Sequence, residues 1–381
     1  MKIVIAPDSY KESLTAKQVC QAIAKGFSRI IPDADYVLLP VADGGEGTVQ
    51  SLVDATGGEI KALAVSGPLG VAVDAFYGVL GDDSHTAVIE MAAASGLHHV
   101  PMPQRDPKIT SSYGTGELIL AALNGGAKRL IIGLGGSATN DAGIGMMAAL
   151  GVKFLDDQQC RISPCGGDIK RLASIDVSEI DPRLQSTEIL VACDVDNPLC
   201  GPDGATYTFG PQKGGREDDL QALDKALLHF GNIVYRDLGR SVMDVAGGGA
   251  AGGMAAAFLA FTNAVIKPGI DLVLEAVNFT DVIADCDLII TGEGRIDAQT
   301  AHGKTPMGVA QRGKQFDIPV IAIAGCLGSG YQAIYDCGID SIFAIVPAAI
   351  PLQKAFAEAE VNLTNSAENI ARLYCMASAS A

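Results

Sequence analysis

The chain has 381 residues, of which 48% are hydrophobic, and it carries a formal net charge of −17. This length indicates two domains of ordinary size, each with enough apolar residues for a core. The negative charge excludes nucleic acid as the expected partner, because phosphate backbones are bound by concentrated Lys and Arg.

Other features of the composition indicate a cytoplasmic protein. The nine cysteines are scattered and form no CxxC pair, which favours reduced thiols over a disulfide framework or a zinc site. No apolar run is long enough to span a membrane, and Lys2 is the only basic residue at the start, so no signal peptide is expected. We expect a monomer or homodimer that acts on a small molecule and binds neither membranes nor nucleic acid.

Short apolar strands alternate with helices along most of the chain. The first strand, 2–6, precedes a helix at 15–31, in which Val19, Ile23 and Phe27 lie on one face. Further strands are expected at 36–41, 60–66, 71–79, 86–91, 128–134, 188–193, 287–291, 319–325 and 341–346. Further helices are expected at 45–55, 115–124, 142–150, 216–237, 306–316 and from about residue 352. Continuous Val, Ile and Leu runs are typical of parallel strands covered on both faces, so the sequence predicts an α/β fold with a mainly parallel sheet.

The middle of the chain differs from its two ends. The strands after Gly58 alternate more and indicate antiparallel pairing, and a long loop is expected at 156–168. We therefore predict a discontinuous, doubly wound Rossmann- or flavodoxin-like domain at 1–76 and 281–381, with a mixed α/β domain inserted at 77–280. The segment "GGGAAGG" at 247–253 is interpreted as a closely packed helix start, with a hinge as the alternative.

The strand ends carry an unusual number of glycines, hydroxyls and carboxylates. They read "APDSYKES", "PVADGGEGT", "GLGGSATND", "ACDVDNP", "TGEGRID" and "AIAGCLGSG". Ligands of open α/β sheets bind beyond the carboxyl ends of the strands, where glycine and helix N-termini suit phosphate. Nearby carboxylates suit Mg²⁺ or proton transfer. Each segment alone has a simpler explanation, such as helix capping by Asp8 or Asp43, and the recurrence favours a phosphoryl-transfer site.

Two short nucleotide-binding patterns are weak. "GLGGSA" at 133–138 fits the dinucleotide fingerprint G-x-G-x-x-A, but the expected acid would be Asp156 or Asp157, in a predicted loop. The stretch "GKT" at 303–305 resembles the end of a P-loop, but the required first glycine is Ala298. If the protein uses ATP, it therefore binds ATP through a fold other than a P-loop.

Eight long motifs together resemble the type 1 glycerate kinase family of bacteria. They are "KIVIAPDSYKESLTA", "PVADGGEGT", "RDPKITSSYGTGELI", "GLGGSATNDAG", "ACDVDNPLCG", "FGPQKGG", "GGGAAGGMAA" and "TGEGRIDAQTAHGKTPMGVA", in order from Met1 to about Pro347. The resemblance implies ATP- and Mg²⁺-dependent phosphorylation of D-glycerate in glyoxylate and related organic-acid breakdown. It also implies two α/β domains, the second resembling a restriction-endonuclease sheet, with the active site in the cleft between them. Asp196 is a mild departure, because relatives often carry Thr there.

Roles are hypothesised for individual residues on this basis. Asp194 is the first candidate for the general base and Asp8 the second, with Lys11 beside it. Arg295 is the first candidate for the substrate carboxylate, since a guanidinium matches it in geometry. Further substrate contacts are expected from Ser9, Asp297 and Glu293, and Asp43 and Glu293 are the candidate metal ligands. Nucleotide or phosphate contacts are expected from Gly44, Gly45, Gly135, Gly136, Ser137, Asn140, Lys213 and Lys304.

Three alternatives stay open at this point. The same kinase could phosphorylate the 3-hydroxyl, although the resemblance favours the 2-hydroxyl and 2-phosphoglycerate. A nicotinamide-dependent hydroxy-acid dehydrogenase and a non-catalytic sugar-acid sensor would use a similar ligand.

Overall fold

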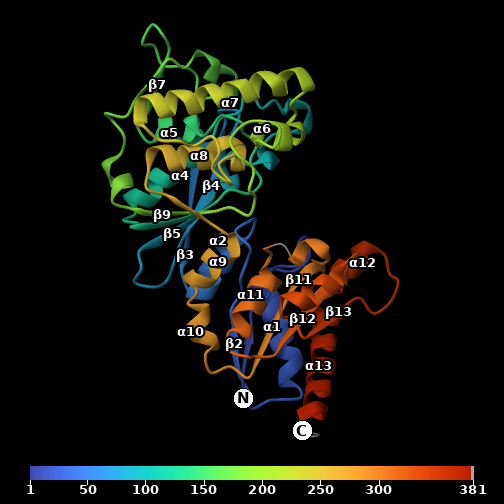
Figure 1. Cartoon of the computed structure of the whole chain (residues 1–381). Coiled ribbons are helices and arrows are strands. Elements are labelled where there is room, and N and C mark those ends of the chain that lie inside the picture. Colours follow the sequence, from blue (N-terminus) through green and yellow to red (C-terminus); the bar gives the residue numbers. More distant parts are fainter. Residues whose placement is uncertain (302, 379–381) are drawn as a thin grey trace. The chain divides into compact units, whose positions relative to one another are not determined.

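The computed structural model describes residues 1–301 and 303–378. The chain forms two compact units (Figure 1), here called unit 1 (Met1–Asp43, Gln50–Gly58 and Gly269–Ala381) and unit 2 (Gly44–Val49 and Glu59–Pro268). Each unit has its own sheet, one entirely parallel and one mixed, so the predicted α/β class is confirmed. None of the helices in the described part is long and apolar enough to cross a membrane.

The sheet of unit 1 has five parallel strands in the order β13–β12–β11–β1–β2. The strands are β1 (Lys2–Ile5), β2 (Asp35–Leu38), β11 (Leu288–Ile296), β12 (Val320–Leu327) and β13 (Ser341–Ala344). Counted along the chain within unit 1, this is the order 2-1-3-4-5 of flavodoxin-like folds. The predicted flavodoxin-like sheet is confirmed.

Two helices cover one face of this sheet. In Figure 1, α1 (Ala16–Ser28, blue) lies beside α13 (Ala359–Ser378, red). Thr15 begins α1 with a capping box, in which the Gln18 N–H donates to the Thr15 hydroxyl and the Thr15 N–H donates to the Gln18 side chain. A side chain at Gly26 would lie 2.4 Å from the Thr364 carbonyl oxygen, so the close approach of α13 requires glycine there.

Helix α11 (Thr305–Lys314) packs on the opposite face, with Gly313 against Ile289 and Val320. Helix α9 (Gly269–Ala276) packs against α11 through Ile270 and Gly308. The other helices of this unit are α10 (Phe279–Ile283) and α12 (Leu352–Ala357), and α2 (Thr48–Thr56) runs across the division between the units.

Strand β11 extends beyond its predicted end at residue 291. The glycines of "TGEGRI" permit this, because a Cβ at Gly292 would lie 1.9 Å from the Ile323 carbonyl oxygen of the neighbouring strand. The pairing continues to Arg295 opposite Cys326 and Ile296 opposite Leu327. Residues two apart on a strand share a face, so Glu293 and Arg295 point to the same side of the sheet.

Unit 2 holds a six-stranded mixed sheet in the order β10–β9–β6–β5–β4–β3. Its strands are β3 (Glu59–Ser66), β4 (Ala72–Val79), β5 (Thr86–Glu90), β6 (Arg129–Gly133), β9 (Glu188–Ala192) and β10 (Val265–Lys267). The first two pair antiparallel, as predicted from their alternation, and β5, β6, β9 and β10 are parallel. A small separate hairpin, β7 (Lys153–Leu155) with β8 (Ser174–Asp176), flanks the long loop predicted at 156–168.

The helices of unit 2 are α3 (Ala92–Ser95), α4 (Tyr113–Asn124), α5 (Ile144–Ala149), α6 (Ala205–Phe209), α7 (Glu217–Leu238) and α8 (Ala250–Phe261). The start of α8 is the glycine-rich segment, and it is tightly packed. A Cβ at Gly249 would lie 2.2 Å from the Pro198 carbonyl oxygen, and one at Gly252 would lie 2.1 Å from that of Thr139. This supports the packing interpretation over the hinge.

The boundaries of the units differ from the expected domain boundaries at 76 and 281. Strands β3 and β4 pair with β5 and therefore belong to the mixed sheet, whereas α9 packs on α11 of unit 1. We propose that the two units are the two predicted domains, with the boundaries moved to Gly58 and Gly269. The likeness of unit 2 to restriction endonucleases and the position of the active site stay predictions.

Candidate active site

The strand order of unit 1 reverses between β1 and β11. A ligand of an open α/β sheet binds outside the carboxyl ends of the strands at such a point. Asp8 follows β1 directly, and its N–H donates to the Gly292 carbonyl of β11 over 2.8 Å. Gly294 of β11 allows the segment after Asp8 to pack closely on this strand, since a Cβ at Gly294 would lie 3.3 Å from the Tyr10 Cα. Asp8, Glu293 and Arg295 therefore come together at the place where this fold binds ligands.

Asp8 is buried, with 8% of its surface exposed, and is held on both carboxylate oxygens. One oxygen accepts from the Ser9 N–H at 2.6 Å and from the Ser9 hydroxyl at 3.2 Å. The other accepts from the hydroxyl of Thr305 at 2.9 Å. Burial, with the Asp43 charge, raises the pKa of Asp8 to about 6 despite the hydrogen bonds from Thr305 and Ser9 and the Lys11 charge.

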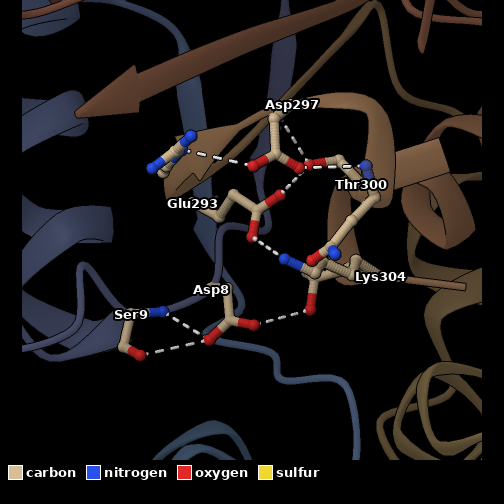
Figure 2. Close-up of polar contacts among 9 residues, drawn as sticks. Asp8, Ser9, Glu293, Asp297, Thr300 and Lys304 are labelled. Carbon is tan, nitrogen blue, oxygen red and sulfur yellow. Dashed lines mark hydrogen bonds and ion pairs between the residues drawn. The ribbon is translucent and has the colours of Figure 1, made fainter. Parts of the chain in front are cut away.

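Glu293 lies in the same group of side chains (Figure 2). One carboxylate oxygen accepts from the Thr300 hydroxyl at 2.6 Å, and the other lies 3.6 Å from the Lys304 ammonium. Burial, together with the charges of Asp8 and Asp43, raises the pKa of Glu293 to about 7 despite the hydrogen bond from Thr300 and the charge of Lys304. The negative charges of Asp8 and Asp43 thus act on Glu293, and a cation nearby would relieve this repulsion.

Arg295 is the exposed member of this group. Its guanidinium Nε lies 3.2 Å from the Asp297 carboxylate, and 64% of its side chain is exposed. Asp297 is fixed in turn, because it accepts from the Gln299 N–H while its own N–H donates to Thr300. The guanidinium keeps donors available for a carboxylate ligand.

Among the residues described, no three His, Cys, Asp or Glu side chains are grouped closely enough to hold a metal ion. Mg²⁺ in phosphoryl-transfer sites usually takes only one or two carboxylates and completes its shell with phosphate and water oxygens. The mutual repulsion of Asp43, Asp8 and Glu293 fits such a partly protein-bound cation.

The two predicted phosphate loops lie against each other in unit 2. A Cβ at Gly133 would lie 2.5 Å from the Gly44 carbonyl oxygen, and one at Gly135 would lie 3.6 Å from the Gly45 Cα. The positive φ angles of Gly44 (90°) and Gly136 (75°) require glycine for these turns. Ser137 is buried and forms a bridge with Gly96, so the loop at 135–140 is anchored at its centre.

Glu90 was not among the predicted site residues, and it changes the interpretation of the first loop. Its carboxylate accepts from the N–H of Val49 at 2.8 Å and from those of Gly47 and Thr48 at the start of α2. These helix N-terminal donors are therefore already used by a protein carboxylate. The signal for Glu90 is a single acid at the end of the apolar strand "TAVIE".

Two polar residues of the second loop have structural partners. Asp141 is fully buried and accepts hydrogen bonds from the N–H and hydroxyl of Ser112 and from the N–H groups of Gly143 and Gly145. Asn140 donates from its side chain to the Thr206 hydroxyl at 3.0 Å. Lys213 is buried too, with its ammonium 2.7 Å from the Thr139 carbonyl oxygen. A direct contact of Lys213 with phosphate, as predicted, does not fit this burial.

Asp194 lies in an exposed loop that follows β9. Its neighbours Cys193, Val195 and Asp196 line a largely apolar pocket of about 480 Å³, together with Val245 and Ile266. Burial thus distinguishes the two candidates for the general base, with Asp8 enclosed and Asp194 exposed.

The dinucleotide fingerprint does not have the required context. The loop at 133–138 follows β6 of the mixed sheet, and Asp156 lies beside the small hairpin, paired with Arg171 at 2.9 Å. In a dinucleotide fold this acid would end the next parallel strand. Thr300 and Thr305 were also missed as site residues, although both stand in the last quoted motif.

Comparisons with known proteins address the family to which the chain belongs. Residues 3–375 match the model of the glycerate kinase family. A glycerate kinase of Bacillus subtilis is 57% identical over 97% of both chains, and a glycerate 2-kinase of Escherichia coli K12 is 52% identical over 97% of both. A crystal structure from Salmonella typhimurium LT2, of a protein named as a candidate glycerate kinase 2, has a TM-score of 0.93 at 51% identity and covers 99% of both chains.

The family match spans nearly the whole chain, and the relatives match it at high identity over nearly their full length. The chain therefore belongs to the glycerate kinase family.

Proposed function

We propose that the protein transfers the γ-phosphoryl group of ATP to the 2-hydroxyl of D-glycerate, giving 2-phosphoglycerate and ADP. The observation that carries this proposal is the 52% identity, over 97% of both chains, to a protein named glycerate 2-kinase. The group of side chains around Asp8 and Arg295 supplies what such a reaction needs.

In this proposal, Arg295 binds the substrate. Its exposed guanidinium, oriented by Asp297, would take the glycerate carboxylate through two parallel hydrogen bonds. Ser9 and Asp297 lie near enough to the group to contact the substrate hydroxyls. The substrate is thereby oriented by a cation against the overall negative charge of the protein.

Asp8 is our first candidate for the general base, in place of Asp194. Its pKa of about 6 lies close to neutral pH, and two hydrogen-bonding neighbours, Ser9 and Thr305, fix its orientation. As the substrate oxygen attacks the γ-phosphorus, Asp8 takes the hydroxyl proton and the bond to the ADP oxygen breaks. Lys11, whose charge acts on Asp8, would offset the charge that develops near it.

Glu293 and Asp43 would hold Mg²⁺, which would neutralise negative charge on the phosphate groups. Lys304 lies 3.6 Å from Glu293, at the position just before α11. From there its ammonium would neutralise the transferred group. In unit 2, nucleotide phosphate would bind at the exposed Gly135 and Gly136 of the loop at 135–140, whereas the burial of Ser137 and Asn140 does not fit the direct phosphate contacts predicted for them. Gly44 and Gly45 would support this loop indirectly, because they pack against Gly133 and Gly135.

We infer that the reaction belongs to organic-acid breakdown such as glyoxylate metabolism and takes place in the cytoplasm. The nine free cysteines and the acidic composition support that compartment.

A coupled assay of ADP release tests the proposal. Purified protein with ATP, Mg²⁺ and D-glycerate should release ADP at a rate that depends on D-glycerate. ATP turnover without any dependence on D-glycerate would contradict it. Consumption of a reduced nicotinamide cofactor instead would favour the dehydrogenase, and glycerate binding without turnover would favour the sensor.

A further inference from the structure

Gly328 is the first residue after β12, and the proposed function gives it no role. A Cβ at this position would lie 2.7 Å from the Asp297 Cβ, 2.9 Å from the Arg295 Nε and 3.0 Å from the Arg295 Nη2. Apart from its own chain neighbours, these are the nearest heavy atoms, and all of them belong to the ion pair between Arg295 and Asp297. The absence of a side chain at position 328 therefore leaves the space that this ion pair occupies.

The backbone conformation of Gly328 does not by itself require glycine. Its φ angle lies outside the left-handed region, in contrast to that of Gly330 at 73°. An alanine at position 328 would therefore meet a steric conflict with the ion pair and no conformational strain of its own. What the glycine provides at this position is room for the guanidinium of Arg295.

Two main-chain hydrogen bonds hold Gly328 close to the ion pair. The Gly328 N–H donates to the Ile296 carbonyl at 2.7 Å, and the Ala298 N–H donates to the Ser329 carbonyl at 3.1 Å. These bonds join the segment after β12 to the residues on both sides of Asp297. Because the backbone is held in this way, the side chain of Arg295 is the part that would move if a Cβ were added.

The Asp297 side of the pair is fixed as well. One carboxylate oxygen accepts from the Gln299 N–H at 2.9 Å, and the Asp297 N–H donates to the Thr300 hydroxyl at 3.1 Å (Figure 2). The other carboxylate oxygen lies 3.2 Å from the Arg295 Nε. Asp297 and Gly328 thus face the guanidinium edge that Nε and Nη2 form. Among the described residues, Asp297 is the acidic partner of Arg295, so the edge formed by Nη1 and Nη2 keeps its donors for a ligand.

Stability gives little reason to preserve this arrangement. The side chain of Arg295 is 64% exposed and that of Asp297 is 20% exposed. Such an ion pair contributes little to folding, because water screens the charges and ordering a long side chain costs entropy. Glycine adds a cost of its own, since it loses more conformational freedom on folding than other residues. A glycine that makes room for an exposed guanidinium is therefore better explained by what that guanidinium binds.

We propose that Gly328 is a positioning residue for Arg295. It leaves the space in which the Nε–Nη2 edge of the guanidinium lies against Asp297, and it thereby directs the Nη1–Nη2 edge to the carboxylate of the substrate. The inference rests on the proposed function, because that function assigns the substrate carboxylate to Arg295.

The test uses the full chain and the variants Gly328→Ala, Arg295→Ala and the two combined. Ser329→Ala is the matched control, because Ser329 is exposed, follows Gly328 directly and keeps its main-chain carbonyl after the substitution. The KM values for D-glycerate and ATP and the denaturant midpoint of unfolding are measured for each protein. Crystal structures are determined for the unliganded Gly328→Ala variant and for the wild-type protein with D-glycerate.

Gly328→Ala should raise the KM for D-glycerate about tenfold, as expected for a weakened hydrogen bond to a charged group, and leave the KM for ATP near its original value. In the Arg295→Ala background the same substitution should change the KM for D-glycerate by less than about twofold, because its effect depends on the guanidinium. Ser329→Ala should change neither constant. The crystal structures should show the guanidinium displaced from Asp297 in Gly328→Ala, and the glycerate carboxylate at Nη1 and Nη2 in the wild-type protein.

Four results would overturn the inference. They are an unchanged KM for D-glycerate in Gly328→Ala, an equal rise in the Arg295→Ala background, a rise in both KM values with a lower unfolding midpoint, and a glycerate carboxylate that replaces Asp297 at Nε. The last result is read from the wild-type protein and decides the question even if Gly328→Ala does not fold. A wild-type protein without kinase activity would instead refute the proposed function. In that case the unliganded Gly328→Ala structure still tests the inference, which an undisplaced guanidinium would overturn.

Discussion

The hydroxyl of Thr305, in the first turn of α11, donates a 2.9 Å hydrogen bond to Asp8 at the end of β1, across 297 residues of sequence. This contact joins the first and last chain segments of unit 1 within the candidate active site. It also gives Asp8 a fixed orientation, which a general base requires before its pKa becomes relevant.

Asp8 rather than Asp194 should carry the catalytic proton transfer. Asp8→Asn keeps the size and one acceptor of the side chain but removes its basicity, so kcat should fall by about 10²–10⁴ while the KM for D-glycerate changes little. Asp194→Asn, at the exposed alternative position, should retain most of the activity. Steady-state kinetics of the two variants test this assignment. A large loss of kcat in Asp194→Asn, with near-normal kcat in Asp8→Asn, would identify Asp194 as the base.

The pH dependence of kcat/KM should reflect two raised carboxyl pKa values. Asp8, with a pKa of about 6, must be unprotonated to accept a proton, and Glu293, with a pKa of about 7, must be ionised to bind Mg²⁺. Because protonation inactivates both groups, kcat/KM should fall as the pH decreases from 7 to 6 and below. Glu293→Gln should remove the dependence near pH 7. A profile that stays flat down to pH 5 would refute these assignments.

Arg295 should determine the affinity for the substrate carboxylate. Loss of a charged bidentate contact predicts that Arg295→Ala raises the KM for D-glycerate about 10–100-fold while the KM for ATP stays near its original value. The exposed Arg161, which lies 3.9 Å from Glu179, provides a matched control, and Arg161→Ala should change neither constant. An unchanged KM for D-glycerate in Arg295→Ala would move the carboxylate site elsewhere.

The contact between the two glycine loops should be sensitive to a single methyl group. Gly133→Ala would place a Cβ 2.5 Å from the Gly44 carbonyl oxygen, so the backbone must shift, at a loss of about 1–3 kcal/mol of unfolding free energy. Gly135→Ala meets only an ordinary contact at 3.6 Å and should change stability by less than about 0.5 kcal/mol. Denaturant unfolding of the two variants measures both values. Equal stabilities would mean that the loops are not held together as described.

The sequence predicted the parallel sheet because its strands are continuous apolar runs, and the amphipathic pattern of Val19, Ile23 and Phe27 located α1. It could not locate the end of β11. The glycines in "TGEGRI" indicate a turn when read locally, but here they permit close strand pairing with β12. That extension is what places Glu293 and Arg295 on one face, so the geometry of the site depends on a tertiary contact.

The sequence places Asp8 and Glu293 at strand ends, and the structure brings them together there, while their roles stay predictions. The prediction for Lys213 failed, since nothing in "FGPQKGG" indicates that the lysine is enclosed by the segments around Thr139 and Gly252. The partners of a buried charge come from distant parts of the chain, and local spacing carries no information about them.

The most direct test of the account is phosphorus NMR of the product formed from D-glycerate, ATP and Mg²⁺. The account predicts that a new phosphomonoester signal, matching authentic 2-phosphoglycerate, grows with the ADP signals in the wild-type protein and is lost in Asp8→Asn. Absence of any phosphorylated three-carbon acid, or a signal matching 3-phosphoglycerate, would contradict it.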